Sequence, residues 1–403
     1  MYVYLILLFH LTAPFLIPNS INLTVAGYIP IIATMMLFAV NYNKITLLKD
    51  TKNEYRIFLL VFVITIILLI FDKFKGMSYL YGCLMSSAMF ILIMKSNMDY
   101  KLVRNLFIGI LIFFIVNSLM SYYERINMIN LIPNRWQETW ENDYHGVGLN
   151  YIFRSSALLG HPLTNAFSIS ILMCSILVMP IKSWIKYTLW GMGIISLLCF
   201  NARGATILSC TFLFIYILYE TIKHPQFKKL LLVTCIICIF IYAFNIIINS
   251  PLAGRLVTSD LIDGSAQTRL TIWKPLEHME VKELLIGFSQ ERYKEVCKLV
   301  KLNTMENWLA GFIYNMGIPF TVAFLIYYFK IYFRALKGLS LFSKMFMMFA
   351  FLSFAFLNNI LSTSIVAWIW TYVVFILTSL MSNKKIAIKI IPKFLISKSA
   401  LNN

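Results

Sequence analysis

Charged side chains are scarce in this chain of 403 residues. Asp, Glu, Lys and Arg together make up 13% of the sequence, and only 17 residues are acidic. Hydrophobic residues account for 60%, and the mean hydropathy is +0.77. A soluble domain of this length needs many more polar side chains to cover its surface. The composition therefore excludes a soluble globular protein and predicts an integral membrane protein.

Residues that bind metals or form disulfides are also few. The chain has seven cysteines and five histidines, and no pair of histidines has the spacing of metal ligands. Most cysteines lie in apolar segments, including the pair in Cys235-x-x-Cys238, which we interpret as core packing. Only Cys297 lies in a segment that we expect to be exported. The sequence therefore predicts neither a disulfide framework nor a structural metal, and no cofactor.

Long apolar segments fill most of the chain. A membrane helix needs roughly 20 apolar residues to cross a hydrocarbon core of about 30 Å. Because unpaired backbone groups are costly in lipid, such segments must be helices. The sequence predicts an all-α polytopic membrane protein, with 1–403 forming a single membrane domain of about 12 transmembrane helices. The predicted segments are at about 2–18, 23–40, 57–71, 77–94, 105–120, 162–181, 184–200, 205–221, 230–248, 308–330, 345–360 and 365–381.

The distribution of basic residues indicates the orientation of the chain. With the N-terminus in the cytoplasm, nearly all of the net charge of +18 falls on the cytoplasmic side. Both termini are then cytoplasmic, including a tail at 382–403. Two long loops lie outside, one at 121–161 and a larger one at 249–304 between helices 9 and 10. This asymmetry explains the basic pI, so nucleic acid is not expected as a partner.

Arginine, unlike lysine, is concentrated in the predicted outer segments. Topology needs only positive charge, whereas the planar guanidinium can hold phosphate through two parallel hydrogen bonds. The pattern indicates an outer surface that binds a phosphate-bearing ligand, although drift in a small sample would produce the same pattern. The outer arginines are Arg125, Arg135, Arg154, Arg203, Arg255, Arg269 and Arg292.

Arg203 is one candidate for chemistry, in the stretch Asn201-Ala202-Arg203-Gly204-Ala205 between predicted helices seven and eight. The connection is tight, so this side chain must lie near the outer headgroup boundary, and Gly204 permits close approach of another backbone. The alternative is an arginine that reaches the interface from a helix end and has no further role.

A second group of candidates opens predicted helix six, at Gly160-His161-Pro162-Leu163-Thr164-Asn165. His161, with Arg154 upstream, could line a polar cleft, because His is the side chain most ready to transfer protons near neutral pH. The same stretch also makes an ordinary helix start, with Pro162 in the first turn and polar side chains satisfying free backbone donors.

The large outer loop supplies further candidates. Arg269 and Trp273 are four residues apart, so a helix would place both on one face, where the ring can pack on a sugar and the guanidinium can bind phosphate. Ordinary cation–π packing would give the same spacing. Arg255 lies earlier in the loop. The sequence of residues 274–300 predicts one or two short amphipathic helices, broken at Gly287.

Glu306 and Asn307 precede predicted helix ten on its outer side. A carboxylate at this position could accept the proton of a sugar hydroxyl. The alternative is a helix cap, since free amides and the helix dipole stabilise a carboxylate at a helix N-terminus.

Taken in order, these pieces resemble the O-antigen ligase/polymerase superfamily, the Wzy-type polymerases and WaaL-type ligases of bacterial surface polysaccharide. His161-Pro162 with Asn165 is similar to the family's His-Pro-Asn-like helix opening. Arg203-Gly204-Ala205 is similar to its Ser-Arg-Gly-Ala-like turn.

The large loop and the helix after it extend the resemblance. Arg269 and Trp273 are followed by Gly287. Asn307 is followed, after nine residues, by Gly317, similar to the ligase signature His-Asn-x9-Gly-x-x-Gly.

The sequence also departs from the ligase pattern. Glu306 stands where the ligases carry His, Phe320 stands at the second Gly of the signature, and Ala202 replaces the usual Ser. These differences favour a polymerase, whose sequences are more variable than those of the ligases.

The resemblance implies a metal-independent membrane glycosyltransferase with a GT-C-like fold in the bacterial cytoplasmic (inner) membrane. It would take a growing glycan from undecaprenyl diphosphate and transfer it to a sugar hydroxyl of another lipid-linked repeat unit on the outer face. The product would be O-antigen, capsule or exopolysaccharide. The implied partners are the lipid-linked oligosaccharide and the bilayer, with a flippase and a chain-length regulator as candidate protein partners. The residues expected in catalysis are Arg203, Arg269 and Glu306, and those expected to bind substrate are Arg154, His161, Arg255, Trp273 and Asn307.

Two other functions stay open. A ligase that attaches the glycan to lipid A core or to a protein would use the same donor. A lipid-linked oligosaccharide flippase or transporter belongs to another class, in which ionisable residues are usually buried mid-membrane and internal repeats are common. The predicted spans contain no central Asp or Glu and no repeat, and a flippase has no need of the loop at 249–304.

Overall fold

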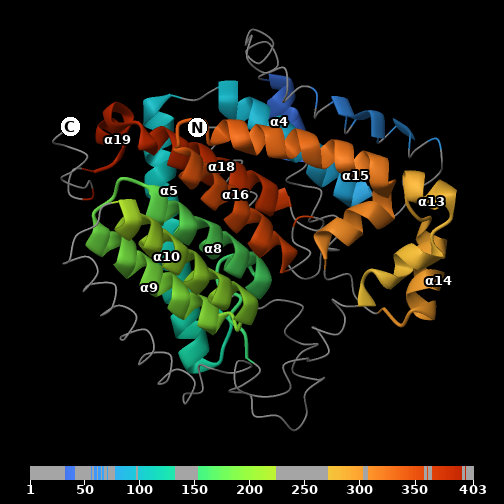
Figure 1. Cartoon of the computed structure of the whole chain (residues 1–403), viewed down its shortest axis with the longest axis horizontal. Helices are drawn as coiled ribbons and strands as arrows, with labels where there is room; N and C mark the ends of the chain where they lie inside the picture. Colours follow the sequence, from blue (N-terminus) through green and yellow to red (C-terminus); the bar gives the residue numbers. More distant parts are fainter. Residues whose placement is uncertain are drawn as a thin grey trace. The chain divides into compact units, whose positions relative to one another are not determined.

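The computed structural model describes residues 32–40, single positions between 56 and 70, 78–96, 99–131, 153–223, 271–302, 307–357, 361, 365–392 and 395. Every regular element in these ranges is a helix (Figure 1). The all-α class predicted from the sequence is thus confirmed for the described part of the chain. The labelled helices are α4 (Ser78–Ser96), α5 (Tyr100–Asn127), α8 (Pro162–Val178), α9 (Ser183–Cys199), α10 (Arg203–Lys223), η2 (Lys274–His278), α13 (Val281–Ile286), α14 (Gln290–Leu299), α15 (Trp308–Ala335), α16 (Leu341–Phe356), α18 (Ile365–Ser382) and α19 (Lys384–Ile390).

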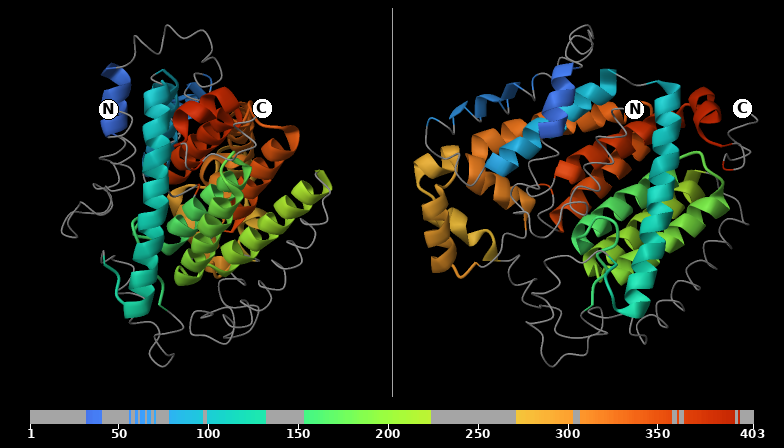
Figure 2. Two further views of the ribbon diagram at one scale, coloured as in Figure 1. Left: turned by 90° about the vertical axis from the view of Figure 1, so that its left-hand side faces the viewer. Right: turned by 180° about the vertical axis from the view of Figure 1, so that it is seen from behind.

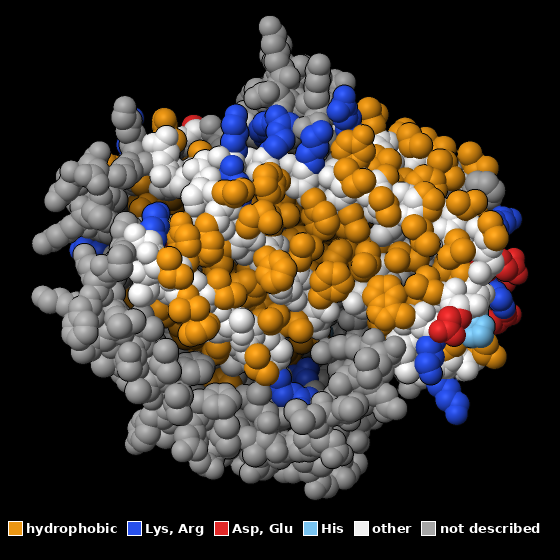
Figure 3. All heavy atoms as spheres, in the orientation of Figure 1, with side chains coloured by type: hydrophobic (Ala, Val, Ile, Leu, Met, Phe, Trp, Pro, Cys, Tyr) orange, Lys and Arg blue, Asp and Glu red, His pale blue; other side chains and the backbone are white. Residues whose placement is uncertain are grey.

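Three of the described helices, α5, α10 and α15, are long and apolar enough to cross a membrane. Shorter apolar helices are α8, α16 and Ala367–Ser382 within α18. Hydrophobic side chains dominate the faces of α15, α16 and α18 that are visible in Figure 3. These helices support a helical membrane protein. The count of twelve spans, the GT-C-like arrangement and the orientation stay predictions.

Most of the predicted apolar segments coincide with described helices. The fourth to eighth segments correspond to α4, α5, α8, α9 and α10, and the last three to α15, α16 and α18. One boundary differs clearly: α5 continues to Asn127, whereas the sequence starts an outer loop at 121. The helix can extend because the side chains of Tyr122, Glu124 and Arg125 have hydrogen-bond partners inside the protein. The first and ninth predicted segments lie outside the described residues.

The chain divides into two compact units. Unit 1 comprises 1–108 and 261–391, and unit 2 comprises 109–260 and 392–403. The single membrane domain at 1–403 stays a prediction, and each unit is described here by itself.

In unit 1, α15 bends sharply at Gly317, whose φ of 79° and ψ of 170° are not helical. Pro319 follows, and a proline inside a helix removes a backbone donor and strains the preceding turn. The hydroxyl of Thr321 donates to the carbonyl of Gly317 at 2.7 Å, which satisfies one acceptor at the bend. Figure 1 shows the bend next to α13.

Aromatic side chains fill the contact between α15, α16 and α18. The ring of Trp368 lies 4.4 Å from that of Tyr328 and 5.5 Å from that of Phe324, measured between centroids. The hydroxyl of Tyr332 donates to the carbonyl of Trp368 at 2.9 Å. Because buried aromatic groups supply large apolar area and their polar atoms find partners here, this contact is the core of unit 1.

In unit 2, α8, α9 and α10 pack side by side (Figure 2). The Tyr122 hydroxyl of α5 donates to the Met192 carbonyl of α9 at 2.5 Å. At the other end of α9, the N–H of Lys182 donates to the carbonyl of Leu395 at 3.0 Å, which joins the C-terminal residues to this unit.

The helices of the large loop are short, as the sequence predicts. In α13, Glu280 and Glu283 form a capping box. The helix ends at Ile286 with Gly287 as its C-cap, and α14 starts after Ser289, whose side chain accepts from the N–H of Arg292 at 3.2 Å. The prediction of short helices broken at Gly287 is confirmed.

Candidate functional site

One end of unit 2 contains the ends of α5 and α9 and the starts of α8 and α10. Only Phe200–Ala202 separates α9 from α10, so Arg203 is the first residue of α10. Asn201 makes the reversal with a φ of 53°, a conformation that Asn adopts more readily than most residues. Its N–H donates to the carbonyl of Leu198 at 2.9 Å, which satisfies an acceptor at the end of α9. The tight turn predicted at Arg203 is confirmed.

The segment Phe153–Gly160 lies against this turn. The N–H of Ser155 donates to the carbonyl of Cys199, the last residue of α9, at 3.1 Å. Arg154 is therefore held at the same end of the unit as Arg203. We call this region the arginine end of unit 2, defined by Arg125, Arg154, His161 and Arg203.

Polar side chains of α5 and α8 hold the main chain of the segment. Consecutive amides from Ser156 to Leu159 each donate to a side-chain oxygen, in place of the ladder that a helix or sheet would provide. The acceptors are Glu124 for Ser156 and Ala157, both at 2.9 Å, Asn117 for Leu158 at 3.0 Å and Asn165 for Leu159 at 3.4 Å. A segment without secondary structure is thus given a defined conformation.

Asn165 connects the segment to the start of α8. Its Nδ2 donates to the carbonyls of Ser156 at 2.5 Å and of His161 at 3.1 Å. The sequence leaves open whether Asn165 satisfies backbone groups at an ordinary helix start or belongs to a polar cleft. The structure gives it backbone partners, and these lie in the segment that carries Arg154.

His161 occupies the N-cap position of α8 with an extended backbone, and Pro162 follows in the first turn. Burial, together with the positive charge of the nearby Arg154, lowers the pKa of His161 to about 4. The imidazole is therefore neutral at pH 7. In this state it can donate or accept a hydrogen bond, and it adds no charge to the arginine end.

Two candidates lie in unit 1. Trp273 precedes η2, its carbonyl accepts from the N–H of Leu276 at 3.1 Å, and its side chain is 37% exposed. Asn307 is the N-cap of α15, and its Oδ1 accepts from the N–H groups of Leu309 at 2.9 Å and Ala310 at 3.2 Å. Asn307 therefore has a structural role in capping, and its role in substrate binding stays a prediction.

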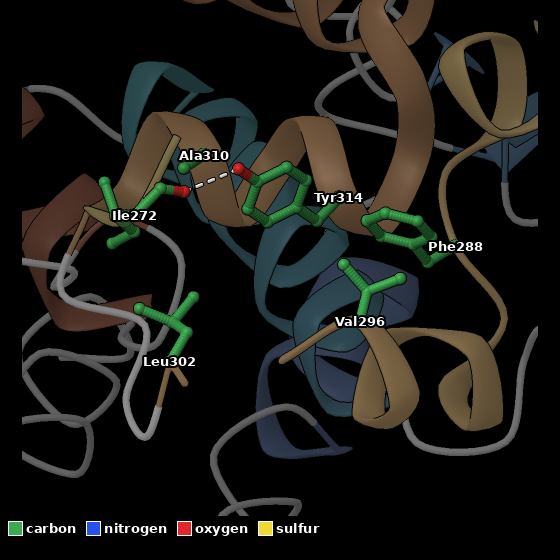
Figure 4. Close-up of a cluster of buried hydrophobic side chains, with 6 residues drawn as sticks. All are labelled: Ile272, Phe288, Val296, Leu302, Ala310 and Tyr314. Atoms are coloured by element: carbon green, nitrogen blue, oxygen red, sulfur yellow. Dashed lines mark hydrogen bonds between the residues drawn. The ribbon is translucent and has the colours of Figure 1, made fainter. Parts of the chain in front are cut away.

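A compact hydrophobic cluster fixes the large loop on the first half of α15. Its buried residues come from the loop and from α15 (Figure 4). The hydroxyl of Tyr314 donates to the carbonyl of Ile272 at 2.6 Å, which ties the residue before Trp273 to α15. The cluster consists of Ile272, Phe288, Val296, Leu302, Ala310 and Tyr314.

The other sequence candidates, Arg255, Arg269 and Glu306, lie outside the described residues. Among the described candidates, Arg154, His161 and Arg203 gather in unit 2, and Trp273 and Asn307 belong to unit 1. No group of three or more His, Cys, Asp or Glu side chains in the described ranges could hold a metal ion.

Sequence reasoning missed Glu124 and the structural use of Arg125. Both side chains are buried in the last turns of α5, although the sequence places them in an outer loop. The sequence did contain a signal for these two residues, since an acid and a base stand next to each other at the edge of an apolar segment. Ionisable residues in a membrane helix usually have a function.

Comparison with known proteins adds no family. No family model matches the chain, and no curated protein matches its sequence.

Proposed function

We propose that the protein polymerises undecaprenyl-diphosphate-linked oligosaccharide repeat units at the outer face of the bacterial cytoplasmic membrane. The growing glycan would leave its undecaprenyl diphosphate and join a sugar hydroxyl of another lipid-linked unit. The observation that carries the proposal is the arginine end of unit 2, where the segment that carries Arg154 is hydrogen-bonded to the end of α9, next to the turn that leads to Arg203. The resemblance of the motifs to the O-antigen ligase/polymerase superfamily supplies the substrate class.

The reaction needs positive charge where the diphosphate leaves. When the new glycosidic bond forms, the bond between the anomeric carbon and the phosphate oxygen breaks, and both electrons go to the diphosphate. Guanidinium groups that are fixed before the reaction can stabilise this charge without reorganising. Arg203 is well suited, because it begins α10, and the positive end of a helix dipole favours an anion.

The reaction also releases a proton from the attacking hydroxyl. Glu306 is the proposed base, and the neutral imidazole of His161 is placed to accept or donate hydrogen bonds near the arginines. Trp273 and Asn307, with Arg255 from the same loop, are proposed to bind the glycan, and Arg269 to share the diphosphate with Arg203.

Glu124 bears on the rival function of transport. Ion-coupled carriers use buried carboxylates that bind and release ions near the middle of the membrane. Glu124 lies instead near the end of α5, and its oxygens accept hydrogen bonds from the segment that follows. This arrangement favours a structural carboxylate over an ion carrier.

The test is Arg→Lys substitution at Arg154 and Arg203, which keeps the charge but removes the planar fork. Each variant is expressed in the source bacterium after the bacterium's chromosomal gene for this protein has been deleted. The length of the surface glycan is then measured on a gel. We expect mainly single repeat units at unchanged protein levels. Arg104→Lys, on an exposed residue in the first turn of α5, is the matched control and should give long chains.

The three proposed classes predict different profiles. Loss of polymerase leaves single repeat units attached to the cell surface, whereas loss of a ligase leaves none attached. Loss of a flippase leaves lipid-linked units on the cytoplasmic side. Normal chains in both Arg→Lys variants would contradict the proposal.

A further inference from the structure

Two neighbouring residues of α5 hold the backbone on both sides of Arg154. The guanidinium Nη1 of Arg125 donates to the carbonyl of Phe153 at 2.5 Å. On the other side, the hydroxyl of Ser155 donates to a carboxylate oxygen of Glu124. Arg154 is the residue between these two contacts, so its backbone position depends directly on Glu124 and Arg125.

The carboxylate of Glu124 accepts four hydrogen bonds. Its Oε2 receives the Ser155 hydroxyl and the N–H groups of Ser156 and Ala157, both at 2.9 Å. Its Oε1 receives the N–H of Leu131 at 3.0 Å. The side chain is completely buried. A carboxylate buried at this depth needs hydrogen-bond donors, and here three of the four come from the segment beside Arg154.

The same framework reaches the turn that carries Arg203. The N–H of Ser155 donates to the carbonyl of Cys199 at 3.1 Å, and Arg203 starts the next helix. The carbonyl of Ser156 accepts from Asn165, which also binds the carbonyl of His161. Movement of the segment would therefore disturb Arg154, His161 and the end of α9 together.

We propose that Glu124 and Arg125 are positioning residues, which fix Arg154 so that it binds the substrate diphosphate together with Arg203. This inference rests on the proposed function. Arg125 is charged like Arg154 but has a different task, because its guanidinium binds the main-chain carbonyl of Phe153. Neither Glu124 nor Arg125 needs to touch the substrate.

Glu124→Gln is a sharp variant, because it changes charge and donors but not size. Both oxygens of Glu124 receive N–H donors, whereas one end of Gln is itself an NH2 group. With the NH2 in place of Oε2, the N–H groups of Ser156 and Ala157 lose their acceptor. With the NH2 in place of Oε1, the N–H of Leu131, just after α5, loses its acceptor. In each orientation one of the two anchors of this carboxylate is therefore lost. Glu220→Gln, a partly buried carboxylate near the other end of α10, is the matched control.

The first measurement is hydrogen exchange by mass spectrometry on the full-length protein in nanodiscs. In Glu124→Gln, the amides of Ser156 and Ala157, or that of Leu131, should exchange about tenfold faster or more, because a lost hydrogen bond to the carboxylate changes an equilibrium by this order. Peptides from the middle of α8 and α10 should be unchanged, and Glu220→Gln should match the wild type. Should Glu124→Gln fail to fold, Asn130→Ala replaces it, since Asn130 supplies a second acceptor to Ser156 at 3.1 Å.

The second measurement is a double-mutant cycle on binding of undecaprenyl diphosphate, with undecaprenol as the uncharged reference. Glu124→Gln and Arg154→Lys should each weaken binding by about tenfold, as expected for a charged hydrogen bond. Because Glu124 acts through Arg154, the double variant should bind no worse than Arg154→Lys alone. A residue that only stabilises the fold would instead give additive losses.

The outcomes separate the two proposals. Unchanged exchange at all three amides that donate to Glu124 (Leu131, Ser156 and Ala157), or additive losses in the cycle, would overturn the positioning role of Glu124. Failure of the wild-type protein to bind undecaprenyl diphosphate would overturn the proposed function. The test of the proposed function uses the wild-type protein alone. The test of the positioning role compares the variants with one another.

Discussion

Gly287 and Gly317 lie at the same close contact between the large loop and α15, and both have left-handed backbone conformations. Their φ angles are 80° and 79°. A Cβ atom at Gly287 would lie 2.6 Å from the carbonyl carbon and oxygen of Asn315, and one at Gly317 would lie 2.7 Å from the backbone nitrogen of Ile286. The N–H of Phe288 donates to the carbonyl of Tyr314 at 2.8 Å across this contact. Glycine is therefore required at both positions for conformation and for space.

Gly287→Ala and Gly317→Ala should each destabilise the protein. We expect a loss of at least about 1–3 kcal/mol from the left-handed backbone alone, with the steric contact adding to it. The measurement is the thermal unfolding midpoint of the purified protein in detergent, together with glycan length in cells. Gly191→Ala is the control, because a Cβ there meets nothing within 4 Å. Midpoints equal to that of the control would show that the loop does not pack on α15 in this way.

The stability of the protein should fall in mild acid because of His161. In the unfolded chain the imidazole binds a proton near pH 6.5, whereas in the folded protein it does so only near pH 4. Between these values the unfolded state binds more protons, so the free energy of unfolding decreases as the pH falls from 6.5 to 4.

His161→Gln should remove most of this pH dependence, since Gln has no proton to gain. Unfolding midpoints of the wild type and the variant, measured across this pH range, test the prediction. His278→Gln, in η2 of unit 1, provides the comparison with another histidine and should retain the acid sensitivity. If the stability of His161→Gln falls with pH as steeply as that of the wild type, other groups cause the pH dependence.

The sequence predicts the local features of this structure better than the contacts between residues that are far apart in the chain. Apolar periodicity and Gly287 predicted the helices and the loop break because these are local properties of the chain. The contact of Gly287 with Tyr314 and Asn315 was hidden, because a positive φ and a close approach leave no trace in hydrophobic pattern. The resemblance of the motifs to a known family pointed to both glycines, but it did not show that they lie at the same contact.

The arginine end shows the same division. Arg203 in a tight turn followed from the short gap between two apolar segments. The position of Arg154 did not, because Glu124 and Arg125 looked like loop residues, and their roles depend on partners at Phe153, Ser155 and beyond. Long-range hydrogen bonds to an irregular segment carry no periodic signal.

Residues 249–304 are predicted to face outward, and a reporter tests this directly. An enzyme that is active only outside the cytoplasm should be active when fused near Gly264 and inactive when fused near Lys228. A fluorescent protein that matures only in the cytoplasm should give the opposite pattern at the same two sites. The expectation follows from the concentration of basic residues on the other side of the membrane. A reversed pattern would invert the whole topology.

The start of α15 narrows the possible roles of Glu306. Capping was the alternative to catalysis for the Glu306-Asn307 pair. Asn307 is the N-cap, and its Oδ1 already accepts from Leu309 and Ala310. The first turn of α15 therefore has its side-chain cap without a carboxylate, so Glu306, which lies outside the described residues, is not needed as the N-cap.

Glu306→Gln distinguishes a base from a spectator, because Gln keeps the size and an acceptor oxygen but cannot take a proton. If Glu306 accepts the proton of the attacking sugar hydroxyl, the surface glycan should collapse to single repeat units that the cell's separate ligase still attaches. Glu291→Gln, on the exposed first turn of α14, should leave long chains and serves as the control. Complete absence of attached repeats would identify a ligase instead. Long chains in Glu306→Gln would assign the carboxylate to the helix dipole and remove it from the reaction.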